Sequence, residues 1–304
     1  MYDIIVIGAG PAGLTAALYA RRAEKSVLVI EKECFGGQIT HSPRVENYPG
    51  FIAMSGNELA DKLIEQVLSQ GAEIELDTVT GIEGTTGDYT VVGESKSYKA
   101  KTVIIATGSR HRQLGIEREN DFVGEGISYC AVCDGAFYKG KSVAVIGGGN
   151  SALVDAVMLS EACTKVYIVQ NLAFLTGESR LAGILEKRDN VEIVYSSVVT
   201  KILGDESFGG IEIENTENGE KRELLVDGMF VAIGQVPENK PFENKAALNS
   251  YGYIEAGESC VPEGSEAGIF AAGDCRTKAV RQVTTATADG AVAALAACKL
   301  IDSL

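Results

Sequence analysis

Proline is scarce in this sequence, tryptophan is absent, and positive charge is in deficit. Only 6 of the 304 residues are proline and 45% are hydrophobic, which is the composition of a folded globular chain and excludes wholesale disorder. The 27 Lys and Arg are outnumbered by 42 Asp and Glu, which gives a net charge of −15. Nucleic acids and anionic membrane surfaces are therefore poor partners for this chain.

Long apolar runs are also missing. No window of 18 apolar residues occurs, and the chain opens on the strand-like segment Tyr2–Ile7 without a basic region or a cleavage site. The sequence therefore predicts neither a membrane span nor a signal peptide. The 7 cysteines are an odd number, unlike the cysteines of a secreted disulfide scaffold. We expect a cytoplasmic protein with reduced thiols and one functional pair.

Glycine, by contrast, is abundant, with 35 residues, and some of it lies in an internal repeat. An apolar strand, a glycine-rich turn and a helical pattern occur twice, with the turns at Gly8–Gly13 and Gly147–Ala152. Each half ends in an apolar strand that stops at a glycine, at residues 103–108 and 229–234. We predict an α/β protein with two Rossmann-like dinucleotide-binding domains of the three-layer ββα type. Alternating segments at 89–92 and 211–213 predict an antiparallel meander added to each parallel sheet.

The C-terminal segment has no third glycine-rich fingerprint. It holds one apolar strand, at 268–274, and an Ala-rich helix from about 286 to 300, which is too little for a domain of its own. We therefore predict that the second domain, residues 113–240, is inserted into a first domain made of 1–112 and 241–304. Ser55 and Glu58 further predict a capping box at the start of a helix.

The first glycine turn is a candidate nucleotide site. Its glycines let the backbone approach a pyrophosphate at a helix N-terminus. Glu31 ends the next strand, 23 residues after Gly8, where a carboxylate accepts ribose hydroxyls. The alternatives are a glycine turn without a ligand and a solvated strand end at Glu31.

Cys130 and Cys133 form the single Cys-x-x-Cys motif of the chain. A structural zinc site needs two further ligands, and neither His41 nor His111 is close in sequence. Asp134 places a carboxylate directly beside the pair, where it can transfer protons when a disulfide opens to a thiol and a thiolate. The pattern favours a redox-active dithiol, and the alternative for Asp134 is a turn or a helix cap.

The motifs of this chain stand in one order from residue 4 to residue 294. They are Gly8–Gly13, Gly36-Gly37-Gln38, Val45–Phe51, Ala106-Thr107-Gly108, Cys130–Gly135, Gly273–Arg276 and Arg281-Gln282-Val283. In these motifs the chain resembles the low-molecular-weight thioredoxin reductases. The resemblance implies an oxidoreductase that binds FAD in residues 1–112 and 241–304. Residues 113–240 then resemble an NAD(P)H domain that carries the redox-active Cys-x-x-Cys.

The resemblance also implies roles for single residues. Cys133 would face the flavin, and Cys130 would exchange with the disulfide of a thioredoxin or a thioredoxin-like protein. Related proteins are usually homodimers. The residues implied at the FAD are Gly8, Gly10, Pro11, Ala12 and Gly13 at the pyrophosphate, Glu31 at the ribose, and Gly37, Gln38, Asn47, Thr107, Gly108, Asp274, Arg281, Gln282 and Val283 around the rest. Without the resemblance, a surface ion pair is the alternative interpretation of Asp274 and Arg281.

The remaining cysteines are scattered along the chain. We expect them to be small buried side chains, except that Cys34 stands beside the expected flavin loop. They are Cys34, Cys163, Cys260, Cys275 and Cys298.

The second glycine turn lacks the charges that select a nicotinamide nucleotide. Glu31 lies 23 residues after Gly8, and the residue 23 positions after Gly147 is Gln170. No charged residue follows Gln170 until Glu178. An NAD site usually has an acid at that point, and an NADP site has arginines just after it. Residues 113–240 hold 11 Lys and Arg against 20 Asp and Glu, a net charge of −9, which further disfavours a 2′-phosphate.

The missing cationic residues make the chain most similar to the ferredoxin-dependent, NADPH-independent flavin thioredoxin reductases. Reduced ferredoxin is then the expected electron donor. NADPH or NADH held differently, a deazaflavin donor, and a redox-sensing flavoprotein without turnover are the alternatives. Ferredoxin is usually acidic, so its docking needs local basic patches, for which the candidates are Arg110, Arg112, Lys139, Lys141, Arg276, Lys278 and Arg281.

Overall fold

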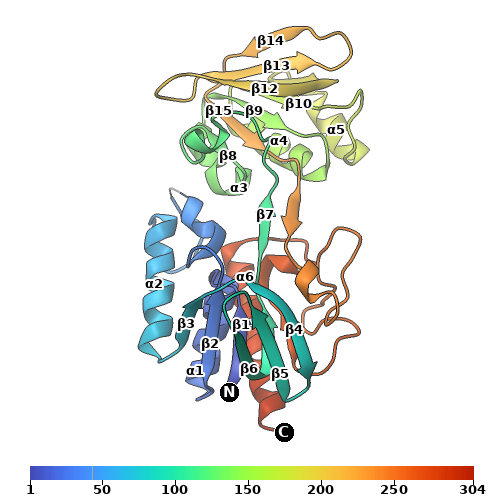
Figure 1. The fold of residues 1–304 in the computed structure, drawn as a ribbon. Helices are drawn as coiled ribbons and strands as arrows, with labels where there is room; N and C mark the ends of the chain where they lie inside the picture. Colours follow the sequence, from blue (N-terminus) through green and yellow to red (C-terminus); the bar gives the residue numbers. More distant parts are fainter. Residues whose placement is uncertain (43) are drawn as a thin grey trace. The chain divides into compact units, whose positions relative to one another are not determined.

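The computed structural model describes residues 1–42 and 44–304 and divides the chain into two compact units (Figure 1). Unit 1 comprises Met1–Arg110 and Val236–Leu304, and unit 2 comprises His111–Gln235. Two short strands, β7 (Ser109–His111) and β16 (Gln235–Pro237), pair where the chain passes between the units. The expected bounds at 112 and 241 therefore lie just beyond these junctions.

Unit 1 is built on a seven-stranded sheet in the order β3-β2-β1-β6-β5-β4, with β17 also paired to β6. The pairs among β1, β2, β3, β6 and β17 are parallel, and β5 is antiparallel to β4 and β6. The strands are β1 (Tyr2–Ile7), β2 (Val27–Glu31), β3 (Glu73–Leu76), β4 (Val79–Thr85), β5 (Asp88–Gly93), β6 (Ser97–Ile105) and β17 (Ile269–Ala271). The first part of β6 pairs with β5 and the last part with β17, so one long strand joins the meander to the parallel sheet.

The central strands β1, β2 and β17 of the parallel sheet in unit 1 are largely buried on both faces, which is why they are mostly apolar, whereas the edge strand β3 is not buried. Ile4 and Val6 contribute to a core with the helices, and Ile5 and Ile7 to a second core with the meander. The helices are α1 (Pro11–Arg22), α2 (Gly56–Ser69) and α6 (Val283–Ile301). Unit 1 thus has the three expected layers (Figure 1).

The helix starts of unit 1 follow local sequence signals. The expected capping box of α2 is present, with Ser55 Oγ accepting from Glu58 N and a Glu58 oxygen accepting from Ser55 N. Helix α6 starts three residues earlier than expected, because Gln282 and Thr285 cap it. Although α6 is 19 residues long, no helix in the described part of the chain is long and apolar enough to cross a membrane.

Unit 2 also combines a parallel sheet with helices and a three-stranded meander, but its meander is a separate sheet. Its parallel sheet has the order β11-β10-β9-β15-β8, while β12, β13 and β14 form a separate three-stranded sheet instead of joining the parallel one as we expected. The strands are β8 (Ile127–Ser128), β9 (Ser142–Ile146), β10 (Lys165–Val169), β11 (Val191–Val194), β12 (Ser197–Leu203), β13 (Gly210–Asn215), β14 (Lys221–Leu224) and β15 (Gly228–Val231). The helices are α3 (Ala131–Asp134), α4 (Asn150–Ala162) and α5 (Ser179–Leu185).

Candidate active site

The first glycine turn, between β1 and α1, combines two glycines that the fold requires with one that leaves open space. Gly8 has a φ of +107°, and a Cβ there would lie 2.3 Å from the carbonyl oxygen of Ala106. A Cβ at Gly13 would lie 1.9 Å from Gly8 O. A Cβ at Gly10 would meet nothing closer than Gly36 O at 4.0 Å. The fold itself would therefore tolerate a side chain at Gly10, so folding does not explain the glycine at this position.

The N-terminus of α1 also lacks an internal partner. Gly10 is the N-cap, no side chain caps the helix, Pro11 is its first residue, and the first turn holds no acidic residue. Ala12 is buried beneath this turn. The backbone N–H groups there are left for an anion, as in other dinucleotide-binding turns.

Glu31 lies beside this turn at the end of β2. Its carboxylate accepts hydrogen bonds from Ala9 N at 2.8 Å, Lys32 N at 2.9 Å and Glu33 N at 3.0 Å. These three backbone donors fix the carboxylate next to the glycine turn, so Glu31 is not a solvated strand end. Its remaining acceptor capacity suits ribose hydroxyls.

The Gly36–Gly37 loop lies against the same turn. Gly36 N donates to Ala9 O at 2.8 Å, and a Cβ at Gly37 would lie 3.1 Å from the Cα of Gly10. Gln38 follows in the short 3-10 helix η1 (Gly37–His41), and its side chain is exposed. The loop thus forms one wall of the space left open at Gly10.

Two polar atoms in unit 1 are buried and have no hydrogen-bond partner among the described residues. They are Oδ1 of Asp274, in the 3-10 helix η5 (Gly273–Cys275), and Nε of Arg281. Burial raises the pKa of Asp274, and the Arg281 guanidinium lies 4.4 Å from the centre of the Tyr253 ring. The surface ion pair that we considered for Asp274 and Arg281 is therefore wrong, and both groups are available to a ligand.

Other residues from the resemblance lie on neighbouring segments of unit 1. Asn47 Nδ2 donates to Oε1 of Gln282 at 3.1 Å, and Gln282 caps α6 immediately before Val283. Thr107 Oγ1 donates to Oδ1 of Asn239 at 3.0 Å. Asn239 is fully buried and was not singled out from the sequence, because its partners are distant along the chain.

These segments meet at one edge of the sheet. Gly8 follows β1, Thr107 and Gly108 follow β6, and Gly273 follows β17, and these three strands are parallel neighbours. A Cβ at Gly273 would lie 2.8 Å from the Cβ of Ala12. A dinucleotide site at the carboxyl ends of parallel strands is what this topology provides. The open turn, the Glu31 carboxylate and the two unpartnered polar atoms fit FAD.

Unit 2 carries the dithiol at the start of α3. Cys130 and Cys133 are joined by a disulfide, and both are half-buried. Cys133 N donates to Sγ of Cys130 at 3.2 Å, which favours negative charge on that sulfur. Within the described residues, no cluster of His, Cys, Asp and Glu is suited to hold a metal.

Asp134, the last residue of α3, lies in the same turn. Its Oδ2 accepts from Ser128 Oγ at 2.6 Å, whereas its Oδ1 is buried without a partner among the described residues. Burial raises the pKa of Asp134, and the Ser128 hydrogen bond partly opposes that shift. Ser128 Oγ also accepts from Cys130 N at 3.1 Å, so one hydroxyl joins the carboxyl group to the cysteine backbone. No sequence motif pointed to Ser128.

The second glycine turn, between β9 and α4, is bonded to the loop that follows β10. Gln170 is 4% exposed, and its side chain donates to Phe174 O at 3.0 Å and accepts from Asn171 N at 3.1 Å. Thr176 N and Gly177 N donate to Gly148 O at 2.8 and 2.9 Å. At the position where an NAD site usually has an acidic residue, this chain therefore has Gln170, whose side-chain amide is already hydrogen-bonded within the chain.

Two further expectations need correction. Arg276 is 8% exposed and the side chain of Lys278 7%, and both bind Asp289, so they are not a surface patch for a partner. Cys34 is exposed, whereas the other four unpaired cysteines are buried.

The chain matches the family model described as pyridine nucleotide-disulphide oxidoreductase over residues 2–290. It is 42% identical to a thioredoxin reductase of Bacillus subtilis, with 100% of this chain and 96% of the relative covered. It is 43% identical to a "34.2 kDa protein in rubredoxin operon" of Clostridium pasteurianum, with 98% and 97% covered.

Solved structures show the same fold. The thioredoxin reductase of Streptococcus pyogenes has a TM-score of 0.95 and 38% identity, with 100% of this chain and 99% of that chain covered. A ferredoxin-flavin thioredoxin reductase of Clostridium acetobutylicum has a TM-score of 0.54 and 31% identity, with 100% and 99% covered.

Thioredoxin reductases of this family are FAD-binding flavoproteins. Both the family model and the curated relatives cover nearly the entire chain, including the first glycine turn and the dithiol. The chain therefore belongs to the pyridine nucleotide-disulphide oxidoreductases, in the low-molecular-weight thioredoxin reductase group, and is an oxidoreductase.

Proposed function

We propose that this protein is an FAD-dependent thioredoxin reductase that passes electrons through the Cys130–Cys133 pair to the disulfide of a thioredoxin. The observation that carries the proposal is the half-buried disulfide with the protonatable Asp134 in the same turn. The names of the relatives support thioredoxin as the substrate.

In this proposal unit 1 holds the cofactor. The pyrophosphate lies at the α1 N-terminus beside Gly10, and Glu31 accepts hydrogen bonds from the ribose hydroxyls. The buried polar atoms of Asp274 and Arg281 that lack a partner form hydrogen bonds with the rest of the ligand. Bound FAD supplies the two electrons that open the disulfide.

The protein's own residues manage the protons and the sulfur exchange. Two electrons break the Cys130–Cys133 bond, and Asp134 gives up one proton, so that a thiol and a thiolate result. Cys130 is the better thiolate because Cys133 N donates to its sulfur. It attacks the partner's disulfide and forms a mixed disulfide, releasing one partner thiolate. Asp134 takes back the proton of the Cys133 thiol. The Cys133 thiolate then attacks the Cys130 sulfur, which releases the second partner sulfur as a thiolate and restores the original disulfide.

Serine substitutions test this proposal without reference to the electron donor. The chemically reduced protein, freed of reductant, is mixed anaerobically with oxidised thioredoxin, and released thioredoxin that carries both thiols is quantified. Cys130→Ser and Cys133→Ser each abolish the transfer but keep bound FAD, while Cys34→Ser, at an exposed cysteine outside the pair, transfers normally. Continued transfer in either dithiol variant would sink the assignment, and a native protein that transfers nothing would be a sensor.

We further propose that reduced ferredoxin is the electron donor. The uncharged loop after β10 and the internally bonded Gln170 leave the second turn without a group to select a nicotinamide nucleotide. The names of two relatives, one from a rubredoxin operon and one a ferredoxin-flavin enzyme, are compatible with an iron-protein donor. Arg112, Lys139 and Lys141 are exposed cations of unit 2 that suit an acidic donor.

The homodimer expected from the resemblance stays a prediction. The mass of the FAD-loaded protein in solution tests it.

A further inference from the structure

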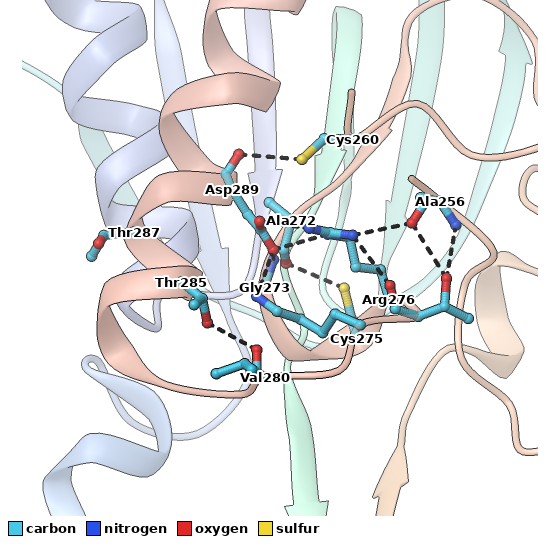
Figure 2. Close-up of polar contacts among 12 residues, drawn as sticks. Ala256, Cys260, Ala272, Gly273, Cys275, Arg276, Val280, Thr285, Thr287 and Asp289 are labelled. Carbon is cyan, nitrogen blue, oxygen red and sulfur yellow. Dashed lines mark hydrogen bonds and ion pairs between the residues drawn. The ribbon is translucent and has the colours of Figure 1, made fainter. Parts of the chain in front are cut away.

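Unit 1 contains a cluster of buried charges, in which Asp289 and Arg276 lie beside Gly273 (Figure 2). Asp289, on α6, binds Arg276 through two contacts, Oδ1 to Nη2 at 2.7 Å and Oδ2 to Nε at 2.9 Å. Lys278 Nζ donates to Oδ2 at 2.9 Å. Asp289 is only 7% exposed, so one carboxylate is shared by two cations away from water.

The same carboxylate also binds the backbone. Gly273 N donates to Asp289 Oδ2 at 2.9 Å (Figure 2). Asp289 therefore contacts both ends of the segment from Gly273 to Lys278. Arg276 Nη1 donates in addition to Ala256 O at 3.1 Å, which anchors the middle of that segment.

This segment presents Asp274, the residue after Gly273. Gly273 lies against α1, because a Cβ there would be 2.8 Å from the Cβ of Ala12. The residue after Asp289, Gly290, lies against the same turn, with a Cβ position 2.2 Å from Ala12 O. Asp289 thus fixes the backbone before Asp274 relative to the α1 N-terminus.

Stability alone does not account for this arrangement. A buried ion pair seldom stabilises a fold more than apolar side chains of the same volume would, since desolvation offsets the attraction. Burial by itself would raise the pKa of Asp289, but Arg276 and Lys278 outweigh burial and hold that pKa below its ordinary value. The carboxylate therefore stays charged and keeps accepting from Gly273 N at neutral pH.

We propose that Asp289 is a positioning residue for FAD, which holds the Gly273–Lys278 segment so that Asp274 meets the ligand. The proposal rests on the FAD site of the proposed function. It assigns to the buried cluster the task of keeping Asp274 at a fixed distance from the α1 N-terminus.

The test is a double-mutant cycle on FAD affinity, measured by titrating the stripped apoprotein with FAD and following flavin fluorescence. Asp289→Asn weakens FAD binding about tenfold, the size expected for losing one hydrogen bond to a charged group. If Asp289 acts through Asp274, the double variant with Asp274→Asn binds FAD no more weakly than Asp274→Asn alone. Additive losses, or a native affinity in Asp289→Asn, would overturn the proposal.

A second variant covers the case in which Asp289→Asn does not fold. Replacing Arg276, Lys278 and Asp289 together by Leu removes all three charges, so no unpaired charge stays buried. Its apoprotein is expected to melt close to the native temperature and yet to bind FAD about tenfold more weakly. Native FAD affinity in this variant would contradict the assignment. None of these measurements uses thioredoxin or an electron donor, so failure of the proposed reductase activity is recorded separately, by turnover of the native enzyme.

Discussion

At the residue scale, the hydroxyl of Ser128 links the two chemical parts of the dithiol site. It donates to Asp134 and accepts from the backbone N–H of Cys130. A hydrogen bond donated to a carboxylate favours its charged form, so Ser128 limits how far burial raises the pKa of Asp134. The residue thereby sets the pH range over which Asp134 carries a proton to give.

Ser128→Ala is expected to raise the pKa of Asp134 further. Because Asp134 must be protonated to act, the alkaline limb of thioredoxin reduction moves to higher pH, by about one unit for one hydrogen bond to a charged group. The measurement is the pH profile of thioredoxin reduction. Ser128→Thr, which keeps the hydroxyl, retains the native profile, and Asp134→Asn loses this limb. A native profile in Ser128→Ala would remove the role of Ser128.

Sequence reasoning found the residues whose chemistry is local in the chain. Cys130, Cys133 and Asp134 lie within one short motif, so the motif itself brings them together. Ser128 is only two residues before Cys130, but no motif marks a serine at that position. Asp289 acts through contacts that only the fold creates, because it reaches Gly273 from another element. The cations Arg276 and Lys278 were misjudged as surface residues for the same reason, because charge alone does not reveal burial.

At the scale of elements, the two glycine turns offer a matched comparison. Gly10 and Gly149 occupy the same N-cap position of α1 and α4, and a Cβ at either one finds room, with nearest atoms at 4.0 and 3.8 Å. Alanine is therefore compatible with folding at both sites. The turns differ in what they are proposed to hold.

Gly10→Ala is expected to weaken FAD binding by about tenfold or more, because its methyl group occupies space next to the pyrophosphate. Gly149→Ala is expected to leave both the FAD affinity and the rate with reduced ferredoxin unchanged. FAD titration of the apoproteins and turnover assays check the two variants side by side. Equal losses of FAD in both variants, or a slower rate in Gly149→Ala alone, would contradict this division of roles.

Strand β7 contains His111, whose ring stacks on Tyr129 with centroids 5.3 Å apart. Burial lowers the pKa of His111 from 6.5 to about 4. Between these values the unfolded chain binds a proton that the folded chain does not, so stability falls as the pH drops from 6.5 toward 4. This residue accounts for a loss of about 2 kcal/mol at about pH 5.

His111→Phe is expected to keep the stacking and to remove this part of the pH dependence. The free energy of unfolding, measured in urea at neutral pH and near pH 5, should fall less in the variant than in the native protein. An equal fall in both proteins would mean that His111 titrates normally.

The sequence pattern predicted the meander strands of both units, but it did not predict which sheet the strands of unit 2 would join. The meanders of both units were expected in the same place, yet only that of unit 1 joins its parallel sheet. Strand β6 has nine residues, enough to pair with both β5 and β17, whereas β15 has only four. Alternating polarity predicts a strand, and strand length then decides what it can pair with.

At the scale of the whole molecule, the net charge of −15 bears on the electron donor. An acidic chain repels nucleotide phosphates, and it also repels an acidic ferredoxin unless local cations guide the encounter. Charges act over about 10 Å at ordinary salt, so a few exposed cations near the docking site outweigh a distant excess of acids. The repeat of two dinucleotide folds is thus proposed to serve one bound cofactor and one protein donor.

An anaerobic absorbance titration tests this account most directly. Photoreduced ferredoxin, NADPH and NADH are added separately to the oxidised FAD-loaded protein, and oxidised thioredoxin is added last. We predict that ferredoxin bleaches the flavin band, that thioredoxin restores it, and that neither nicotinamide nucleotide changes it. Rapid bleaching by NADPH or NADH, with ferredoxin inert, would contradict the account.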